Sequence, residues 1–186
     1  MLFRSARCGV CTGIGAHIGP QRGMIRTFIG LGANLGADLD SMRVTLLDAL
    51  DLLAAAPGTK FVARSSFYQT APVDAGGPDY LNAVAAFDTT LDAPSLLAVC
   101  LAIEQVHRRE RPFRHAPRTL DLDLLLYGDA VVDTPTLTLP HPRMHERAFV
   151  LAPLLDIAPD AVIPGKGRAD QWLKTVGGQR FSKIAE

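Results

Sequence analysis

The fold of this chain is decided by one stretch, Arg118-Thr119-Leu120-Asp121-Leu122-Asp123-Leu124-Leu125-Leu126-Tyr127, which has the pattern of a buried strand. Side chains alternate between the two sides of a strand, so one face is predicted to carry Leu120, Leu122, Leu124 and Leu126. Asp121 and Asp123 then share the other face, about 6 to 7 Å apart along the strand. Two like charges this close favour a bound divalent cation or a counter-ion.

The segment just upstream is rich in arginine. Residues 107–118 hold a single acid, Glu110, and the basic side chains Arg108, Arg109, Arg111, Arg114 and Arg118. Guanidinium groups bind phosphate oxygens, and Mg²⁺ is held by one or two carboxylates together with substrate phosphates. The two features together predict a Mg-ATP-dependent transferase, because phosphoryl-type transfer depends chiefly on positioning and electrostatics. The alternative is a structural network of ion pairs between these aspartates and arginines.

The composition favours one globular domain. The 186 residues are 48% hydrophobic and 20% charged, and 19 basic side chains balance 19 acidic ones. A formal net charge of zero gives no sign of a general nucleic-acid or membrane-surface binder. No apolar run approaches the roughly 18 residues of a membrane span. Three cysteines, Cys8, Cys11 and Cys100, cannot form a disulfide framework, and we expect a reducing cytoplasm.

Residues 1–23 differ from the rest of the chain, because they contain no acid and show no sustained hydrophobic period. Cys8 and Cys11 have CxxC spacing, but a structural zinc site needs about four ligands and only His17 lies nearby. We interpret residues 1–23 as a disordered extension, or as the result of a start codon assigned upstream of Met24. A single domain is expected over residues 24–186.

The hydrophobic periods predict the order β-α-β-β-α-β. Strands are predicted at residues 25–29, 59–68, 80–87 and 118–127, and helices, with Asp38 and Asp92 at their starts, at residues 38–56 and 92–108. The remainder is predicted as a C-terminal elaboration with a hairpin strand at 130–132, an extended segment at 134–142, a helix at 146–155, a strand at 161–163 and a helix at 170–176. This order predicts an α+β, ferredoxin-like βαββαβ core, in which helices pack on one face of an antiparallel sheet.

Two further features concern the strand predicted at residues 80–87. Tyr80 and Asn82 fall on one face at its start, where they could stack on and hydrogen-bond a flat heterocycle; ordinary packing is the alternative. The loop before it, residues 69–79, is long for a hairpin and rich in proline and glycine, which is typical of a functional loop. Cys100 is predicted to be a small buried side chain of the second helix.

Several of these residues resemble a known family. Arg114 to Asp123 is similar to the signature R-x-[GA]-P-R-x-x-D-[LIV]-D of 6-hydroxymethyl-7,8-dihydropterin pyrophosphokinase. The resemblance continues from Met24 to the C-terminus in the blocks Gly32–Leu35, Ser65–Thr70, Pro78–Asn82, Pro140–Arg143 and Glu146–Phe149. It implies transfer of a pyrophosphoryl group from ATP to the pterin hydroxymethyl oxygen, giving the pterin diphosphate and AMP, on the way to folate.

The resemblance also implies roles for individual residues. Asp121 and Asp123 would hold two Mg²⁺ ions, and the catalytic arginines would be Arg109 and Arg118. ATP contacts are implied for Glu104, Arg109, Arg111, Arg118, Leu124, Thr138, His141 and Arg147. Pterin contacts are implied for Thr70, Val73, Tyr80, Asn82, Asp121 and Phe149, with Tyr80 and Phe149 stacking on the ring. His115 departs from the family, because some members carry a tryptophan there.

The expected partners are therefore ATP and hydroxymethyl-dihydropterin, with no nucleic acid and no membrane, and the chain is expected to be a monomer. Two other classes of function stay open at this point. One is another Mg-dependent phosphotransferase or phosphohydrolase, which would account for the acids but not for Tyr80, Asn82 and Phe149. The other is a non-catalytic RNA-binding ferredoxin-like module, in which Asp121 and Asp123 would repel phosphates.

Overall fold

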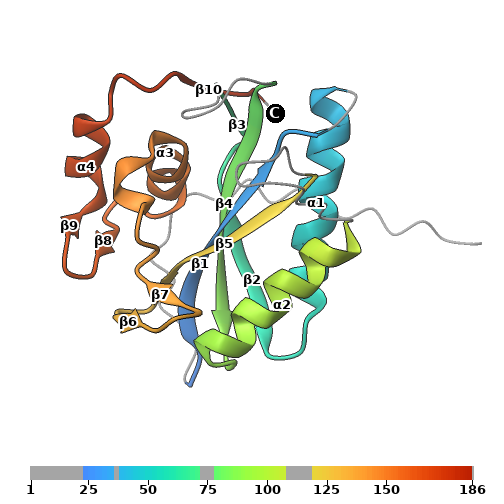
Figure 1. Ribbon diagram of the computed structural model, residues 1–186, viewed down its shortest axis with the longest axis vertical. Coiled ribbons are helices and arrows are strands. Elements are labelled where there is room, and N and C mark those ends of the chain that lie inside the picture. The colour runs from blue at the N-terminus through green and yellow to red at the C-terminus, as the bar shows by residue number, and fades with distance from the viewer. Residues whose placement is uncertain (1–22, 36–37, 72–77, 108–118, 186) are drawn as a thin grey trace, which may run out of the picture.

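The computed structural model describes residues 23–35, 38–71, 78–107 and 119–185. An antiparallel sheet stands at the centre, with helices on both of its faces (Figure 1). The strand order is β10-β3-β4-β1-β5, and β2 also pairs with β4. These strands are β1 (Ile25–Ala33), β2 (Thr59–Arg64), β3 (Tyr68–Thr70), β4 (Tyr80–Thr89), β5 (Asp121–Tyr127) and β10 (Phe181–Lys183). The predicted βαββαβ core is confirmed.

Two helices, α1 (Leu39–Ala55) and α2 (Ala93–Val106), cover one face of the sheet. Asp38 caps α1 as predicted: its carboxylate accepts from the Ser41 backbone N–H at 2.8 Å, and Ser41 Oγ accepts from the Asp38 N–H at 3.2 Å. Asp92 caps α2, because its carboxylate accepts from the Ser95 backbone N–H at 2.8 Å. The core under these helices contains Leu46, Leu53 and Cys100, all without measurable exposure, which confirms the prediction for Cys100.

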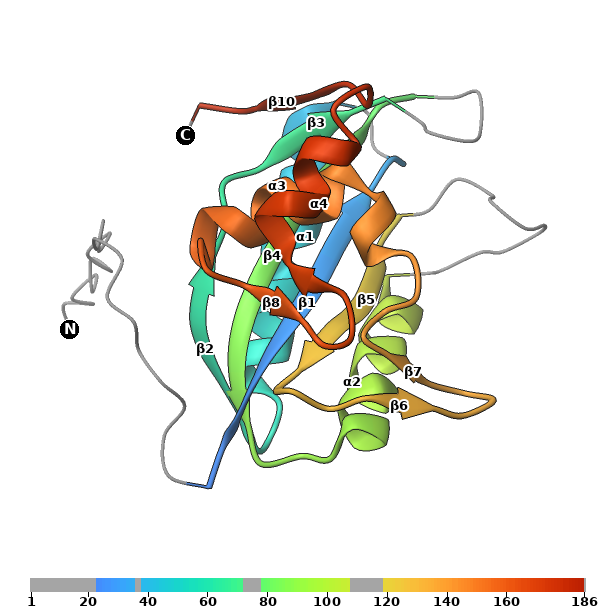
Figure 2. The ribbon, with the colours of Figure 1, turned by 90° about the vertical axis from the view of Figure 1, so that its left-hand side faces the viewer.

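The C-terminal elaboration covers the opposite face. It consists of the 3₁₀ turn η1 (Met144–Glu146) and the helices α3 (Ala148–Ile157) and α4 (Ala169–Thr175), which lie in front of the sheet in Figure 2. A second apolar cluster joins Leu151 and Leu154 of α3 to Val84 of β4 and Leu125 of β5. The sheet is therefore buried on both faces. No helix of the described residues is both long and apolar enough to cross a bilayer.

The prediction that Leu126 lies on the same face as the earlier leucines is wrong. Phe28 of β1 pairs with Leu126, whereas the next residue, Ile29, pairs with Leu124, so Leu125 is an extra residue in β5. Such a bulge sets two residues against one and interrupts the alternation of faces. Leu125 and Leu126 consequently both belong to the cluster under α3, while the three earlier leucines belong to the cluster under α1 and α2.

Two other predicted elements need correction. The strand predicted at residues 59–68 divides into β2 and β3, because at the break the Ser65 hydroxyl accepts from the Val84 backbone N–H at 3.0 Å in place of a strand partner. The hairpin predicted at residues 130–132 is also wrong: β6 (Val132–Asp133) pairs with β7 (Thr138–Leu139) and not with β5. In the tail, β8 (Val162–Ile163) pairs with β9 (Gly167–Arg168), and β10 was not predicted.

Leu46→Ala should lower the free energy of unfolding by about 3 kcal/mol, because it leaves a cavity in the core under α1. Val44→Ala on the same helix is the matched control: Val44 is 66% exposed, and its truncation should stay within about 0.5 kcal/mol. Urea unfolding of the two variants measures both values. Equal effects would show that α1 does not pack on the sheet by the face described.

Candidate functional site

The register of three neighbouring strands brings the predicted site residues together. Asn82 of β4 lies opposite Gly32 of β1, which lies opposite Asp121 of β5. The next row on this face joins Val84 to Gly30 and Gly30 to Asp123. Since Val84 packs under α3, alternation places both rows on the face of the sheet that α3 covers. The two aspartates therefore share this face, as predicted.

Gly32 keeps the centre of the first row open. A Cβ atom added there would lie 3.1 Å from Asn82 Oδ1 and 4.0 Å from Asp121 Cβ. Any side chain would therefore occupy the space between the amide and the carboxylate. A glycine inside a strand often marks such a close approach of a ligand or of another group. The spacing of Gly30 and Gly32 is visible in the sequence, but the predicted strand ended at residue 29, whereas β1 continues to Ala33.

The amide of Asn82 is held by a neighbouring strand. Its Nδ2 donates to Thr70 Oγ1 at 2.8 Å, and both side chains are buried. Thr70 in turn lies opposite Tyr80, which is half-buried at the start of β4. Because Nδ2 is engaged by Thr70, Oδ1 is the amide atom that faces the Gly32 backbone. The structure thus gathers Thr70, Tyr80 and Asn82 at one end of the sheet.

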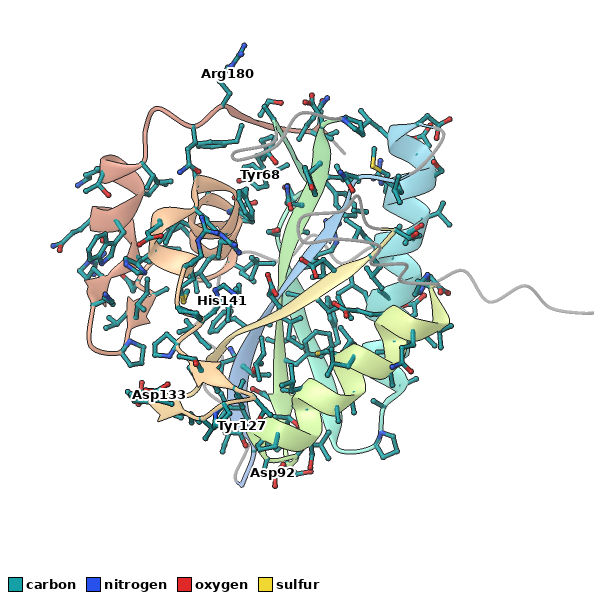
Figure 3. The ribbon with its side chains drawn as sticks, viewed as in Figure 1. Tyr68, Asp92, Tyr127, Asp133, His141 and Arg180 are labelled. Atoms are coloured by element: carbon teal, nitrogen blue, oxygen red, sulfur yellow. The ribbon has the colours of Figure 1, made fainter. Side chains whose placement is uncertain are left out.

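Asp123 is approached by two basic side chains from the C-terminal elaboration. Arg147 Nη1 lies 3.7 Å and His141 Nε2 lies 4.0 Å from Asp123 Oδ2. The His141 backbone N–H donates to the Leu125 carbonyl at 2.9 Å, which fixes this segment beside β5. Figure 3 shows His141 on the side of the sheet where α3 lies. Asp123 keeps 35% of its side chain exposed, so the cluster is open to a ligand.

His141 is neutral at neutral pH. Burial of the ring, followed by the positive charge of Arg147, lowers the pKa of His141 to about 4, although Asp121 acts in the opposite direction. Its Nδ1 accepts from the Arg143 backbone N–H at 3.3 Å, so the ring proton belongs on Nε2. The site therefore offers an N–H donor and, in Arg147, a fixed positive charge next to the acids.

Phe149, in the first turn of α3, lines a pocket beside this cluster. The guanidinium carbon of Arg147 lies 5.5 Å from the centre of the Phe149 ring. The pocket has a volume of about 260 Å³ and is lined by Thr70, Ala71, Ala148, Phe149, Gly178, Gln179, Arg180 and Phe181. Thr70 and Phe149, both predicted to contact the same ligand, thus line one pocket. Arg180 itself extends outward from the edge of the molecule in Figure 3.

The other predicted residues are spread around these. Glu104 of α2 is 1% exposed, and its Oε1 accepts from the Leu122 backbone N–H at 2.8 Å, which secures β5 between the two aspartates. The side chain of Leu124 is in the core under α1 and α2, and Thr138 lies half-buried on β7. Val73 and the arginines Arg109, Arg111 and Arg118 lie outside the described residues.

Asp121 and Asp123 suit a hard cation that takes its other ligands from a substrate. Asp121 and Asp123 provide carboxylate oxygens on one face, and Mg²⁺ is commonly held by one or two carboxylates plus substrate phosphates. Among the residues that the structure describes, no three His, Cys, Asp or Glu side chains gather into a complete metal site. The two carboxylates fit a metal that takes its other ligands from a polyphosphate.

Paired carboxylates next to the fixed positive charge of Arg147 suit an enzyme that transfers a phosphate-containing group, because such transfer depends chiefly on positioning and charge stabilisation. The sequence model of the family described as 7,8-dihydro-6-hydroxymethylpterin-pyrophosphokinase (HPPK) matches residues 28–159. The chain belongs to this family, which confirms the family predicted from the sequence.

Relatives agree with this assignment, and solved structures agree with the fold. The chain is 47% identical over 144 residues to the 2-amino-4-hydroxy-6-hydroxymethyldihydropteridine pyrophosphokinase of Methylorubrum extorquens, covering 77% of this chain and 89% of the relative. Identity to the protein of the same name from Haemophilus influenzae is 37% over 162 residues, covering 87% and 99%. The fold is similar to that of Plasmodium falciparum HPPK-DHPS, with a TM-score of 0.65 at 13% identity. That match covers 82% of this chain and only 42% of the longer solved chain.

The depressed pKa of His141 predicts an acid-sensitive contribution to the stability of the metal-free protein. Between pH 6.5 and about 4 the unfolded chain binds a proton at this histidine and the folded protein does not. The free energy of unfolding should therefore fall as the pH drops through this window, and this contribution should not change further below it. Urea unfolding from pH 7 to pH 4 should show a smaller decline for His141→Gln than for the wild type. Equal declines would contradict the buried, neutral state of this ring.

Proposed function

We propose that this chain transfers a pyrophosphoryl group from ATP to 6-hydroxymethyl-7,8-dihydropterin, giving the pterin diphosphate and AMP in folate biosynthesis. Membership of the family makes the chain a pyrophosphokinase, a transferase with ATP as co-substrate. The observation that carries the assignment of the site is the row Asn82–Gly32–Asp121, which joins an amide suited to a heterocycle to a carboxylate suited to a metal.

The pterin is assigned to the end of the sheet where Thr70, Tyr80 and Asn82 meet. Asn82 Oδ1 accepts a hydrogen bond from the polar edge of the ring, and its orientation is supported by the Nδ2 bond to Thr70 at 2.8 Å. A heterocycle without a matching donor would leave this buried oxygen without its bond, which is a strong basis for selectivity. Tyr80 and Phe149 stack on the ring, and Val73, with Asp121 at the far end of the row, completes the contacts.

Asp121 and Asp123 are assigned to two Mg²⁺ ions. When bound, the ions neutralise charge on the phosphates of ATP and so favour attack by the hydroxyl group. The carboxylates supply the oxygen ligands, and the buried bond from Leu122 N–H to Glu104 keeps the strand between them in place. This support is the contribution of Glu104 that the structure describes; a direct contact with ATP is part of the proposal.

ATP is assigned to the side of Asp123 that faces the C-terminal elaboration. Arg147 provides a positive charge and neutral His141 an N–H donor, while Thr138 and the backbone of Leu124 complete this group. Arg109, Arg111 and Arg118 bind the phosphates, with Arg109 and Arg118 as the catalytic arginines. In the reaction the hydroxymethyl oxygen bonds to the β-phosphorus and loses its proton. The bond from that phosphorus to the oxygen it shares with the α-phosphorus breaks, and AMP leaves.

The oligomeric state, cellular location and domain extent of the enzyme are also proposed. We propose a monomer and a cytoplasmic enzyme with no nucleic-acid or membrane partner. The zero net charge and the odd number of cysteines support these assignments. Residues 24–186 are proposed as a single domain. The interpretation of residues 1–23 as an extension stays a prediction, because all but Gly23 lie outside the described residues.

Asp123→Asn should abolish most AMP formation, by about a hundredfold or more, because an amide replaces a charged metal ligand of the same shape. Asp133→Asn, at an exposed position on β6, is the control and should keep the wild-type rate. The measurement is AMP release from Mg-ATP with and without the pterin. AMP that forms only with the pterin supports the proposal. ADP as product, or hydrolysis without the pterin, would instead indicate another phosphotransferase or a phosphohydrolase.

Gly32→Ala should raise the KM for the pterin by about tenfold while changing the KM for ATP less, because the new methyl group displaces Asn82 Oδ1. Gly177→Ala serves as the control: it follows α4, and its nearest neighbour would be the Lys174 carbonyl at an ordinary 3.7 Å. Steady-state kinetics with each substrate varied in turn separates the two constants. Unchanged pterin kinetics in Gly32→Ala would contradict the placement of the pterin over this row.

A further inference from the structure

A single side chain from the C-terminal tail holds the backbone on both sides of Arg147. Gln179 Nε2 donates to the Glu146 carbonyl at 2.7 Å, and Gln179 Oε1 accepts from the Ala148 N–H at 2.9 Å. The first group belongs to the peptide unit that precedes the Arg147 Cα, and the second belongs to the one after it. Both ends of one amide are therefore used to fix the orientation of one residue.

The start of α3 explains why this contact is needed. The Ala148 N–H is one of the first N–H groups of a helix, which have no acceptor within the helix itself. The cap residue is Arg147, with φ −121° and ψ 107° and no hydrogen bond from its side chain to the helix. A guanidinium group has donors but no acceptor, so Arg147 cannot cap the helix that it begins. Gln179 supplies the missing acceptor from the tail.

The orientation of the Arg147 backbone matters because of where its side chain lies. Its Nη1 is 3.7 Å from Asp123 Oδ2, and its guanidinium carbon is 5.5 Å from the centre of the Phe149 ring. A long side chain amplifies a small rotation of its backbone into a large displacement of the charge at its end. Displacements of about 1 Å are enough to weaken a positioned charge severely.

We propose that Gln179 is a positioning residue for the ATP-binding charge of Arg147. The inference rests on the proposed role of Arg147 in contacting ATP, and it adds a residue to which neither the sequence nor the family resemblance assigned a role. Gln179 acts through the two peptide units that flank Arg147.

The same tail offers a matched control for a purely structural role. Lys183 Nζ lies 2.7 Å from Asp156 Oδ1 and 3.0 Å from Oδ2, so β10 is also fastened to α3 near the other end of that helix. Figure 1 shows β10 at the edge of the sheet beside β3, with the tail leading to it from α4 past α3. Lys183→Ala loosens this attachment while leaving the peptide units around Arg147 bonded to Gln179.

The test compares four variants. Three carry a single change, Gln179→Ala, Lys183→Ala or Arg147→Ala, and the fourth carries both Gln179→Ala and Arg147→Ala. Gln179→Ala should raise the Kd and KM for Mg-ATP about fivefold, because the arginine charge is misplaced. Lys183→Ala should leave ATP affinity at the wild-type value, even if its melting temperature falls as much as that of Gln179→Ala. The double variant should bind ATP no more weakly than Arg147→Ala alone, since residues acting through one another are not additive.

Several outcomes would overturn the inference. One is an ATP affinity of Gln179→Ala within twofold of the wild type. Another is a weakening of ATP binding in Lys183→Ala equal to that in Gln179→Ala. The third is additive effects on ATP binding in the double variant. If Gln179→Ala does not fold, Gln179→Glu replaces it: the carboxylate still accepts from Ala148 but can no longer donate to the Glu146 carbonyl. Wild-type ATP affinity in that variant would also overturn the inference.

The proposed function is tested separately by the same set. Normal ATP affinity in Arg147→Ala would remove both the role of Arg147 and this inference, while pterin-dependent AMP formation would still support the reaction. A weakened Arg147→Ala beside a normal Gln179→Ala would overturn the positioning inference alone.

Discussion

The pairing of β1 with β4 on one side and β5 on the other is the constraint on which the rest of the structure depends. It aligns Asn82, Gly32 and Asp121 in one row, and Val84, Gly30 and Asp123 in the next. A slip of one residue in either pairing would turn the acids or the amide toward the core under α1 and α2. The apolar residues on that opposite face therefore set the position of the polar ones.

The two faces of the sheet have different roles. The face under α1 and α2 is a continuous apolar core, and it supplies the main burial that holds the register. The other face is apolar only where α3 and α4 pack, around Val84, Leu125 and Leu126. At the first residues of β4 and β5, this face instead carries Tyr80, Asn82 and the two aspartates. The bulge at Leu125 strengthens this division, because it places both Leu125 and Leu126 under α3.

The C-terminal elaboration completes the site as well as covering the sheet. It brings His141 and Arg147 beside Asp123 of β5 and Phe149 beside Thr70 of β3, from a part of the chain with short and irregular elements. Burial against this layer keeps His141 neutral, whereas Arg147 is a fixed cation beside Asp123. The position of that cation depends on a glutamine from the tail, where β10 closes the edge of β3.

The sequence by itself determined the core fold, the two helix caps and the acids on one strand face, because each is encoded by residues a few positions apart. The sequence also shows Gly30 and Gly32, but only the pairing of β1 with β5 places them opposite the acids. Only the tertiary structure decided that Leu126 changes face, that residues 132–133 pair with β7, and that Gln179 reaches Ala148. Each of these depends on a partner strand or on a contact between distant segments, and no local pattern of side chains specifies such a partner.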